Sequence, residues 1–203
     1  MDIQKTMDNL RRNEFKVSFF ATKEEAAEYL NKAIDGKTVG FGDSKTLEAL
    51  DMYNLLKTHN TVYDPVQVQS EGEEEFCRIG KKALDTDIFL LSANGISETG
   101  ELVNIDGTGN RVAGSLFGHD KVYFVAGTNK IRPSLQDAID RARNIAAPLD
   151  TMKFGYRTPC AVKGDRCYDC HSPQRICNAL VIHMQKMNNM DMEVILIDEG
   201  LGF

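Results

Sequence analysis

Four cysteines stand close together towards the C-terminal end of the chain, and thiols are side chains that readily bind zinc or iron. They are Cys160, Cys167, Cys170 and Cys177. The central Cys-x-x-Cys pair can chelate one metal ion from a single turn, and the outer two cysteines can complete a tetrahedral set. Three basic residues lie among them and would favour the thiolate form: Lys163, Arg166 and Arg175. The spacing predicts a metal site formed by all four thiols.

The identity of that metal stays open at the level of the sequence. Zinc takes a closed tetrahedron of thiolates, and an iron–sulfur cluster accepts four cysteines equally well. The spacing matches neither of the common ferredoxin patterns, and no proline follows Cys177. His171 can replace one ligand. Two alternatives need no metal: a redox disulfide between Cys167 and Cys170, or reduced thiols that only pack the C-terminal segment.

A second concentration of polar side chains fills Ser92–His119, which follows an apolar run at 87–93. The segment is rich in glycine, which lets a ligand approach the main chain closely. It also carries Asn, Asp, Glu, Thr and Arg side chains with little apolar surface between them. Binding and catalytic residues concentrate on loops of this kind. The simpler alternative is a β-hairpin with ordinary turns.

Length and composition describe one globular domain over residues 1–203, with a cysteine-bearing segment at 155–190. The hydrophobic share of 42% and the charged share of 27% are those of a soluble protein. The formal net charge of −6 argues against a nucleic-acid partner, because phosphate binding needs clustered Lys and Arg. No apolar run is long enough to span a bilayer, and no signal peptide is visible. We therefore expect a cytoplasmic protein, whose cysteines serve metal or redox chemistry.

Helical and extended patterns alternate along the chain. Apolar spacing and capping signals, including the Thr22–Glu25 capping box, predict helices at 2–13, 22–36, 45–57, 71–83, 133–146 and 172–187. Short apolar runs predict strands at 16–20, 38–41, 61–63, 87–93, 121–126 and 193–197. Strands separated by helices predict an α/β fold with a mainly parallel sheet covered by helices. Cys77, on the helix at 71–83, is expected to be a small buried hydrophobic residue.

Three of the predicted loops should meet at one edge of that sheet. They follow the strands that end near Phe41, Ala93 and Ala126. Open α/β sheets bind ligands at the carboxyl ends of their strands, so these loops should surround one crevice. The turn Gly42-Asp43-Ser44 also precedes a helix, where free N–H groups attract an anion. The alternative is an ordinary cap, in which Asp43 or Ser44 satisfies the helix end.

Three stretches resemble a known family, the lactate-utilisation domain. They are the strand and turn Val39–Leu47, the turn Ser97–Gly100, and the junction at 127–131 that follows a strand. The resemblance covers residues 15–198. It implies a three-layer α/β fold similar to ribose-5-phosphate isomerase, glucosamine-6-phosphate deaminase and the coenzyme A transferases. In those relatives the first glycine-rich loop holds phosphate. It also implies a link to the oxidation of lactate to pyruvate, alongside iron–sulfur partner proteins.

Ser92–Gly95 also resembles the glutamate motif of coenzyme A transferases. Ala93 occupies the position of the nucleophile, which argues against a covalent transferase mechanism. We therefore expect a domain that binds a small anionic metabolite or a nucleotide-like ligand, linked to lactate oxidation and electron transfer. The alternatives are an iron–sulfur electron-transfer protein, or a transferase or isomerase for a phosphorylated or coenzyme A-linked substrate with structural zinc.

The expected ligand-binding residues come from the three loops. They are Gly42, Asp43, Ser44, Asn94, Thr99, Gly100, Asn104, Asp106, Asn110, Arg111 and Gly127. Arg111 would clamp a carboxylate or phosphate, because its planar fork binds either group in two places. Glu98 would be the catalytic proton-transfer group.

Overall fold

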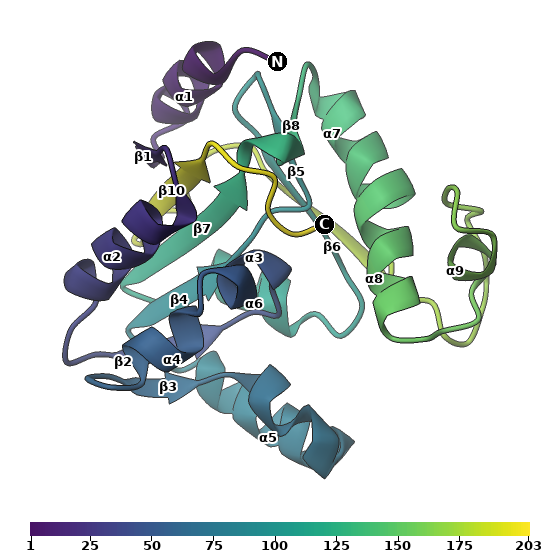
Figure 1. Ribbon diagram of the computed structural model, residues 1–203, viewed down its shortest axis with the longest axis horizontal. Helices are drawn as coiled ribbons and strands as arrows, with labels where there is room; N and C mark the ends of the chain where they lie inside the picture. Colours follow the sequence, from purple (N-terminus) through teal and green to yellow (C-terminus); the bar gives the residue numbers. More distant parts are fainter.

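The computed structural model describes residues 1–203 and divides the strands between two sheets (Figure 1). The larger sheet is entirely parallel, in the order β1-β10-β7-β4-β2-β3. Its strands are β1 (Lys16–Phe20), β2 (Thr38–Phe41), β3 (Thr61–Tyr63), β4 (Ile88–Leu91), β7 (Lys121–Gly127) and β10 (Asp191–Ile197). These are the six strands that the sequence predicts. The predicted three-layer α/β class, with a mainly parallel sheet covered by helices, is confirmed.

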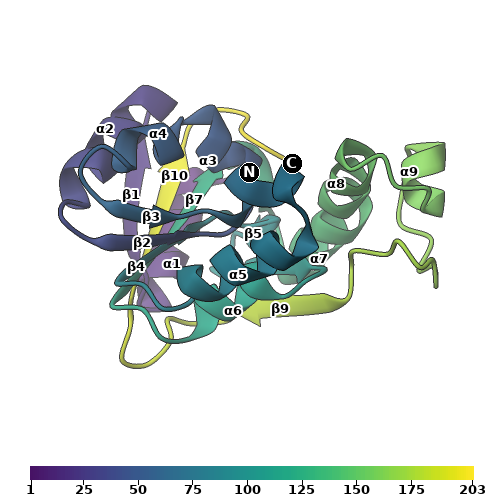
Figure 2. The ribbon, with the colours of Figure 1, turned by 90° about the horizontal axis from the view of Figure 1, so that it is seen from below.

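Helices cover both faces of this sheet (Figure 2). They are α1 (Ile3–Arg12), α2 (Lys23–Ala33), α3 (Lys45–Ala49), α4 (Met52–Leu56), α5 (Glu73–Ala83) and α6 (Asn110–Leu116). Of the remaining helices, α7 (Leu135–Arg141) and α8 (Ala147–Lys153) pack on the smaller sheet, and α9 (Pro159–Lys163) packs on α8. The predicted capping box at the start of α2 is present: Glu25 N donates to Thr22 Oγ1, and the Glu25 carboxylate accepts from Thr22 N. None of the helices is both long and apolar enough to cross a membrane.

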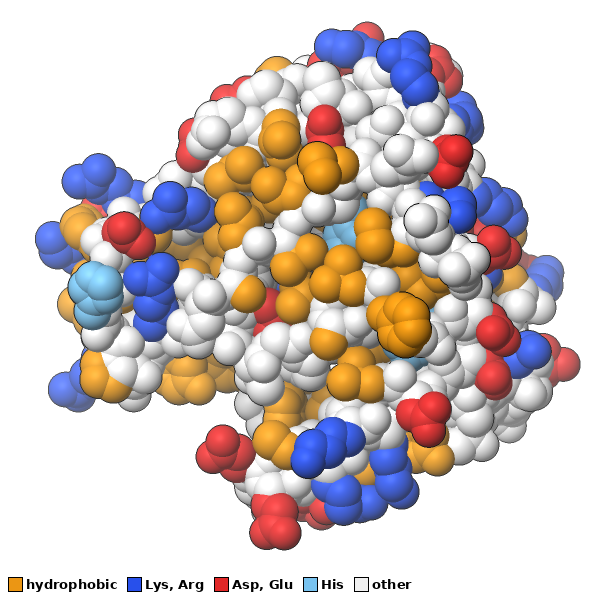
Figure 3. Space-filling model, turned by 180° about the vertical axis from the view of Figure 1, so that it is seen from behind, with side chains coloured by type: hydrophobic (Ala, Val, Ile, Leu, Met, Phe, Trp, Pro, Cys, Tyr) orange, Lys and Arg blue, Asp and Glu red, His pale blue; other side chains and the backbone are white.

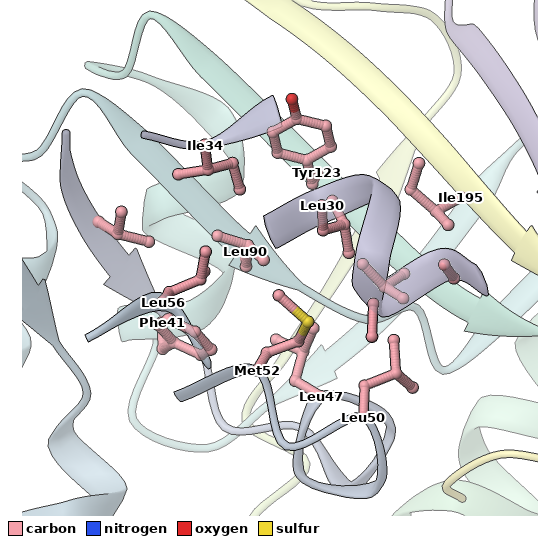
Figure 4. Close-up of a cluster of buried hydrophobic side chains, with 14 of the residues drawn as sticks. Leu30, Ile34, Phe41, Leu47, Leu50, Met52, Leu56, Leu90, Tyr123 and Ile195 are labelled. Carbon is pink, nitrogen blue, oxygen red and sulfur yellow. The ribbon is translucent and has the colours of Figure 1, made fainter. Parts of the chain in front are cut away.

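Both faces of the main sheet are apolar, because successive side chains of a strand point to opposite faces. In β7, Tyr123 and Val125 face α2, α3 and α4, where Figure 4 shows Leu30 beside Tyr123 and Met52 farther along the same cluster. Phe124 faces the opposite cluster, which includes side chains of α1 and of the smaller sheet. Burying one such side chain stabilises the fold by roughly 1.5–3 kcal/mol. Packing on both faces of the sheet fixes the positions of its strands, and therefore of the loops that follow their carboxyl ends.

The smaller sheet has the order β8-β5-β6-β9, with β5 (Gly95–Ser97), β6 (Leu102–Asp106), β8 (Ile131–Arg132) and β9 (Ala179–His183). β5 and β6 pair antiparallel, so the segment Ser92–His119 does contain a hairpin. One face of this sheet packs on the main sheet through Ile96 and Leu102. The other face carries Val103 and Ile105, which pack against α7 and α8. The sequence does not predict this second sheet.

The helix predicted from Pro133 is longer than expected. It begins at Leu135 behind the cap Ser134, widens to a π-helical turn at Ala142–Ala146 and continues as α8. Pro148 lies in the first turn of α8. Proline has no N–H group and its ring clashes with the preceding turn, so the wider turn accommodates it.

The helix predicted at 172–187 is wrong, because that region contains β9. Residues 179–183 pair antiparallel with the whole of β6, from Leu102 opposite His183 to Asp106 opposite Ala179. The spacing of the apolar residues there is compatible with a helix. However, the open edge of β6 offers hydrogen-bond partners that an isolated helix would not use, and Val181 and Ile182 are β-branched. Pairing with β6 therefore makes residues 179–183 a strand and not part of a helix.

Two further boundaries differ from the prediction. The helix expected at 45–57 is divided into α3 and α4 at Asp51, which has a left-handed φ of 53°. α2 ends at Ala33, so Gly36 lies beyond its end, although Gly36 does have a left-handed φ of 63°. Residues 65–71 form a 3₁₀ helix between β3 and α5.

Cys77 is exposed, which contradicts the expectation that it is buried. α5 packs mainly through Gly80 and Ala83, and Cys77 lies outside that stripe. Exposed hydrophobic residues also occur on and around α6 and β9: Leu116, Phe117, Leu180 and Met184. Figure 3 shows hydrophobic side chains gathered on the face seen from behind, where these two elements lie.

Candidate functional site

One pocket opens at the carboxyl-terminal edge of the main sheet and has a volume of about 510 Å³. The loops after β2, β4 and β7 all contribute to it, as the sequence predicts for a crevice at this edge. The other walls come from the end of β6, from the start of α6, from α8, and from the start of α5 with the residues just before it. The side chain of the C-terminal Phe203 also lines it. The pocket thus lies between the two sheets and the α7–α8 arm.

The structure brings several of the expected ligand-binding residues together around this pocket. Those that line it are Asp43, Ser44, Asn94, Asp106, Asn110 and Arg111. Gly42 and Asn104 lie behind them and contact Arg111. A Cβ atom at Gly42 would lie only 2.5 Å from Arg111 Cγ, so glycine is required there by close packing.

Arg111 makes its contacts with the protein itself. Its Nη1 donates to Asn104 Oδ1 at 2.8 Å, and its Nη2 donates to Asn94 Oδ1 at 3.1 Å. Nη2 also donates to the carbonyl of Ile105, and Nε lies 3.6 Å from an Asp106 oxygen. The guanidinium group therefore braces the wall formed by β4, β6 and α6. A ligand would have to displace these partners in order to be clamped by it.

Asp43 and Ser44 are also engaged by the protein. Ser44 is the N-cap of α3, and its Oγ accepts a hydrogen bond from Leu47 N at 3.2 Å. Asp43 forms an ion pair with Lys153 of α8 at 3.4 Å. The cap anticipated as the alternative for this turn is thus present, while both residues still line the pocket.

Lys130 is a pocket residue that the sequence did not single out. It is only 3% exposed, lines the pocket, and follows β7 within the turn that begins at Gly127. Its Nζ lies 2.9 Å from Ser92 Oγ and 3.2 Å from Thr46 Oγ1, and it has no carboxylate partner. A lysine in a polar turn is normally exposed. The position of this turn at the predicted crevice was the only signal in the sequence.

Burial lowers the pKa of Lys130 to about 7, and repulsion from Arg141 and Arg111 adds to that effect. The amine is therefore close to half-protonated near neutral pH. Asp150 on α8 lines the same pocket and has no side-chain hydrogen-bond partner. Burial, followed by repulsion from Asp43, raises the pKa of its carboxyl group. Groups with shifted pKa values in a cleft are typical of functional sites.

Residues 3–197 match the family model of the LUD domain. The chain belongs to the LUD domain family. It is the lactate-utilisation domain family, so the resemblance seen in the sequence motifs is confirmed. A protein of the DUF162 family from Deinococcus radiodurans has a similar structure, with a TM-score of 0.53 and 12% sequence identity. The similarity covers 96% of this chain and 95% of that one and shows a shared fold. No functionally curated protein matches the chain significantly.

Besides Gly42 and Asn104, four of the expected ligand-binding and catalytic residues do not line the pocket of this LUD domain: Glu98, Thr99, Gly100 and Gly127. The buried carboxylate of Glu98 accepts hydrogen bonds from Asp2 N at 2.9 Å and from Lys5 Nζ at 3.2 Å. The hydrogen bond from Asp2 and then that from Lys5 lower its pKa. Glu98 is thus an ionised anchor for α1. Thr99 hydrogen-bonds within its own turn, and Gly100 packs against α1.

Gly127 also lies behind the pocket. It ends β7 and packs against the carbonyl of Glu199 and the side chain of Asn129. Asn129 Oδ1 in turn accepts a hydrogen bond from Leu201 N at 3.2 Å. Gly127 therefore gives the C-terminal tail room to cross the end of the sheet, and the tail then reaches the pocket.

The four cysteines of the predicted metal site line one small cavity of about 20 Å³, which has room for roughly one water-sized group. All four are free and half-buried. No three Cys, His, Asp or Glu side chains are yet close enough together to hold a metal ion. Burial raises the pKa of Cys177, although Arg175 acts in the opposite direction. For Cys177, the expected effect of the basic neighbours is therefore outweighed by burial.

Proposed function

We propose that this lactate-utilisation-type domain binds a small anionic metabolite at the carboxyl edge of its main sheet, with Lys130 as the cationic contact. The main support for this proposal is that Lys130 is buried and lines the pocket, and that its ammonium group has two hydroxyl partners and no carboxylate partner. An ammonium group has three N–H donors, so one donor remains for a ligand. An anion beside it would restore the charge that burial disfavours.

The pocket supports a ligand of metabolite size. Its volume lies within the roughly 300–1,000 Å³ of typical small-molecule sites. Polar groups from three strand ends converge on it, including Asn94 and Asn110. We infer that the ligand is a carboxylate or phosphate compound, and that this binding is the contribution of the domain to lactate utilisation.

Replacing Lys130 with methionine should weaken the binding of such anions by roughly 10- to 100-fold, because a hydrogen bond to a charged group contributes about 1.5–3 kcal/mol. Binding should be measured by calorimetry with lactate, pyruvate, inorganic phosphate and AMP. Affinity in the unchanged protein should be greatest below about pH 7 and fall above it, because the free amine loses its proton there. Lys130→Met should remove this pH dependence.

Lys57→Met is the matched control, since Lys57 lies over the ring of Tyr53 and outside the pocket. It should bind the same anions as the unchanged protein does. Equal affinities in Lys130→Met and the unchanged protein would contradict the proposed role of Lys130. Absence of binding by all four anions would contradict the proposed function.

A second candidate function is metal binding by the four cysteines. We infer a zinc site in preference to an iron–sulfur cluster, because the shared cavity has room for one ion and not for a cluster. Thr158 hydrogen-bonds the Cys160 thiol at 3.2 Å, and Arg143 lies 4.0 Å from Cys167 Sγ. These contacts would stabilise thiolate ligands once the segment closes on the ion.

Protein purified without oxygen should contain about one zinc ion per chain, measured by elemental analysis. Cys167→Ser should lose the zinc, whereas Cys77→Ser should retain it, because Cys77 is an exposed thiol on α5. If the protein instead contained iron and sulfide and showed broad visible absorbance, the proposed zinc site would be wrong. An iron–sulfur cluster with an electron-transfer role would then be favoured. Absence of either metal, even after reconstitution, would contradict a metal site.

A further inference from the structure

We propose that Lys130 is a covalent nucleophile, whose amine forms an imine with the carbonyl carbon of a small anionic carbonyl compound such as a 2-oxo acid. The inference rests on the proposed function, because the imine forms in the same pocket. It narrows the ligand class from anions in general to anions that also carry a ketone or aldehyde group.

The immediate surroundings of Lys130 hold its amine in one place. Ser92, directly after β4, and Thr46, on α3, fix Nζ through their hydroxyl oxygens at 2.9 and 3.2 Å. The two hydroxyl groups lie 3.4 Å apart, so the three polar atoms form one cluster. Two neutral hydroxyl groups orient an amine without holding it in the ammonium form, as a carboxylate would do.

The C-terminal tail closes over this cluster. Thr46 Oγ1 lies 3.4 Å from the carbonyl of Leu201, and a Cβ atom at Gly202 would lie 3.3 Å from Lys130 Nζ. Gly202 has a left-handed φ of 63°, which lets the tail turn at this point. The tail shields one side of the amine from water, while the other side faces the pocket.

This environment favours the neutral amine, which is the nucleophilic form. Desolvation and neighbouring cations are the two conditions that activate lysine nucleophiles in enzymes. Both are present here, because Lys130 is buried and Arg141 and Arg111 act on it electrostatically. With a pKa of about 7, a large fraction of Lys130 is neutral at physiological pH. An exposed lysine, with a pKa near 10.4, is almost entirely protonated there.

The chemical step balances without an oxidant or a reductant. The lone pair of Nζ forms a bond to the carbonyl carbon, and the carbonyl oxygen takes up a proton to give a carbinolamine. Loss of one water molecule then gives the imine, so an amine and a carbonyl yield an imine and water. Ser92 can relay protons at Nζ, and Asp150, whose pKa is raised, supplies a further proton-transfer group in the pocket. The imine nitrogen can then take up one proton, from Asp150 or from water, which places a positive charge beside the carboxylate of the ligand.

The test is reductive trapping in the unchanged protein. Incubation with pyruvate or glyoxylate and borohydride should give one stable adduct per chain, and peptide mass mapping should place it on Lys130. The yield should fall as the pH is lowered below 7, because the amine becomes protonated. Lys130→Arg should give no adduct, and Lys57→Arg should give as much as the unchanged protein.

Mapping the unchanged protein keeps the test valid even if a Lys130 variant fails to fold. An adduct spread over exposed lysines, or no adduct, would overturn the imine. Exclusive labelling of Ser92 by a fluorophosphonate, with no Lys130 adduct, would overturn it in favour of a serine nucleophile with Lys130 as its base. If no adduct forms but lactate, which has no ketone or aldehyde group to react, still binds in a Lys130-dependent manner, only the imine fails. If no anion binds, the proposed function fails as well.

Discussion

Replacing Arg111 with methionine should lower the free energy of unfolding by about 3 kcal/mol, measured by urea denaturation. Methionine keeps the apolar stem but leaves several buried acceptors without a donor, and each costs roughly 1–3 kcal/mol. The acceptors are the side-chain oxygens of Asn94 and Asn104 and the carbonyl of Ile105. Water entering from the pocket would satisfy some of them, which keeps the expected loss at the lower end of their sum.

The Arg111→Met variant also distinguishes between a structural role of Arg111 and a role in binding a ligand. Arg78→Met is the control, because Arg78 is exposed and its ion pair with Glu75 lies on the surface of α5, where pairs contribute little. Arg111→Lys should recover only part of the stability, since an ammonium group lacks the planar fork. If Arg111→Met left stability unchanged and only abolished anion binding, Arg111 would be the clamp that the sequence suggests.

Replacing Glu193 with alanine should destabilise the protein by about 3 kcal/mol. Its carboxylate is fully buried on β10 and accepts hydrogen bonds from Ser18 at 2.7 Å, Tyr29 at 2.9 Å and Lys121 at 2.7 Å. Lys16 forms a further ion pair with it at 3.2 Å. Removing one partner of a buried charge network leaves the others uncompensated, which typically costs 3–5 kcal/mol. The partial exposure of Lys16 and Lys121 places the expected value at the lower end.

The Glu193 network also predicts a dependence of stability on pH. Burial acts to raise the pKa of Glu193, but the hydrogen bonds from Lys121, Ser18 and Tyr29 outweigh it and hold the pKa below the ordinary value. The network therefore contributes fully above the pKa of an unfolded glutamate, about 4.3. Its contribution is lost as the pH falls from there through the folded pKa.

Unfolding of Glu193→Gln should show less acid sensitivity in that window than the unchanged protein. Glu28→Gln serves as the control, because Glu28 pairs with Lys32 on an exposed helix surface and should leave stability nearly unchanged. Parallel pH profiles for the unchanged protein and Glu193→Gln would show that Glu193 does not titrate as expected.

The sequence by itself determined the main sheet and the edge at which the pocket lies. The strands predicted at 38–41, 87–93 and 121–126 contain the continuous apolar runs 39–41, 88–91 and 122–126, as is typical of strands covered on both faces, and polar residues follow each run. Parallel strands bring those following residues to one edge. The sequence alone therefore predicts that Asp43, Asn94 and Asp106 lie around one crevice. The family motifs agree with the family model that matches the chain.

Only the tertiary structure decided which side chains are free for chemistry. Arg111 has the right side chain for a clamp, but its hydrogen bonds to β4 and β6 depend on long-range packing that spacing does not encode. β9 formed because the edge of β6 was open, in a segment whose local pattern also suits a helix.

The burial of Lys130 is likewise set by the tertiary structure and cannot be read from its local sequence. Its local sequence, Gly-Thr-Asn-Lys, is that of an ordinary surface turn. Its burial comes from Ser92, Thr46 and the C-terminal tail, which lie far from it in the sequence. The pKa of a lysine depends on the water and charges around it, and these are set by packing. The sequence predicted the edge of the sheet at which the pocket lies, and the fold placed there the buried amine on which the proposed chemistry depends.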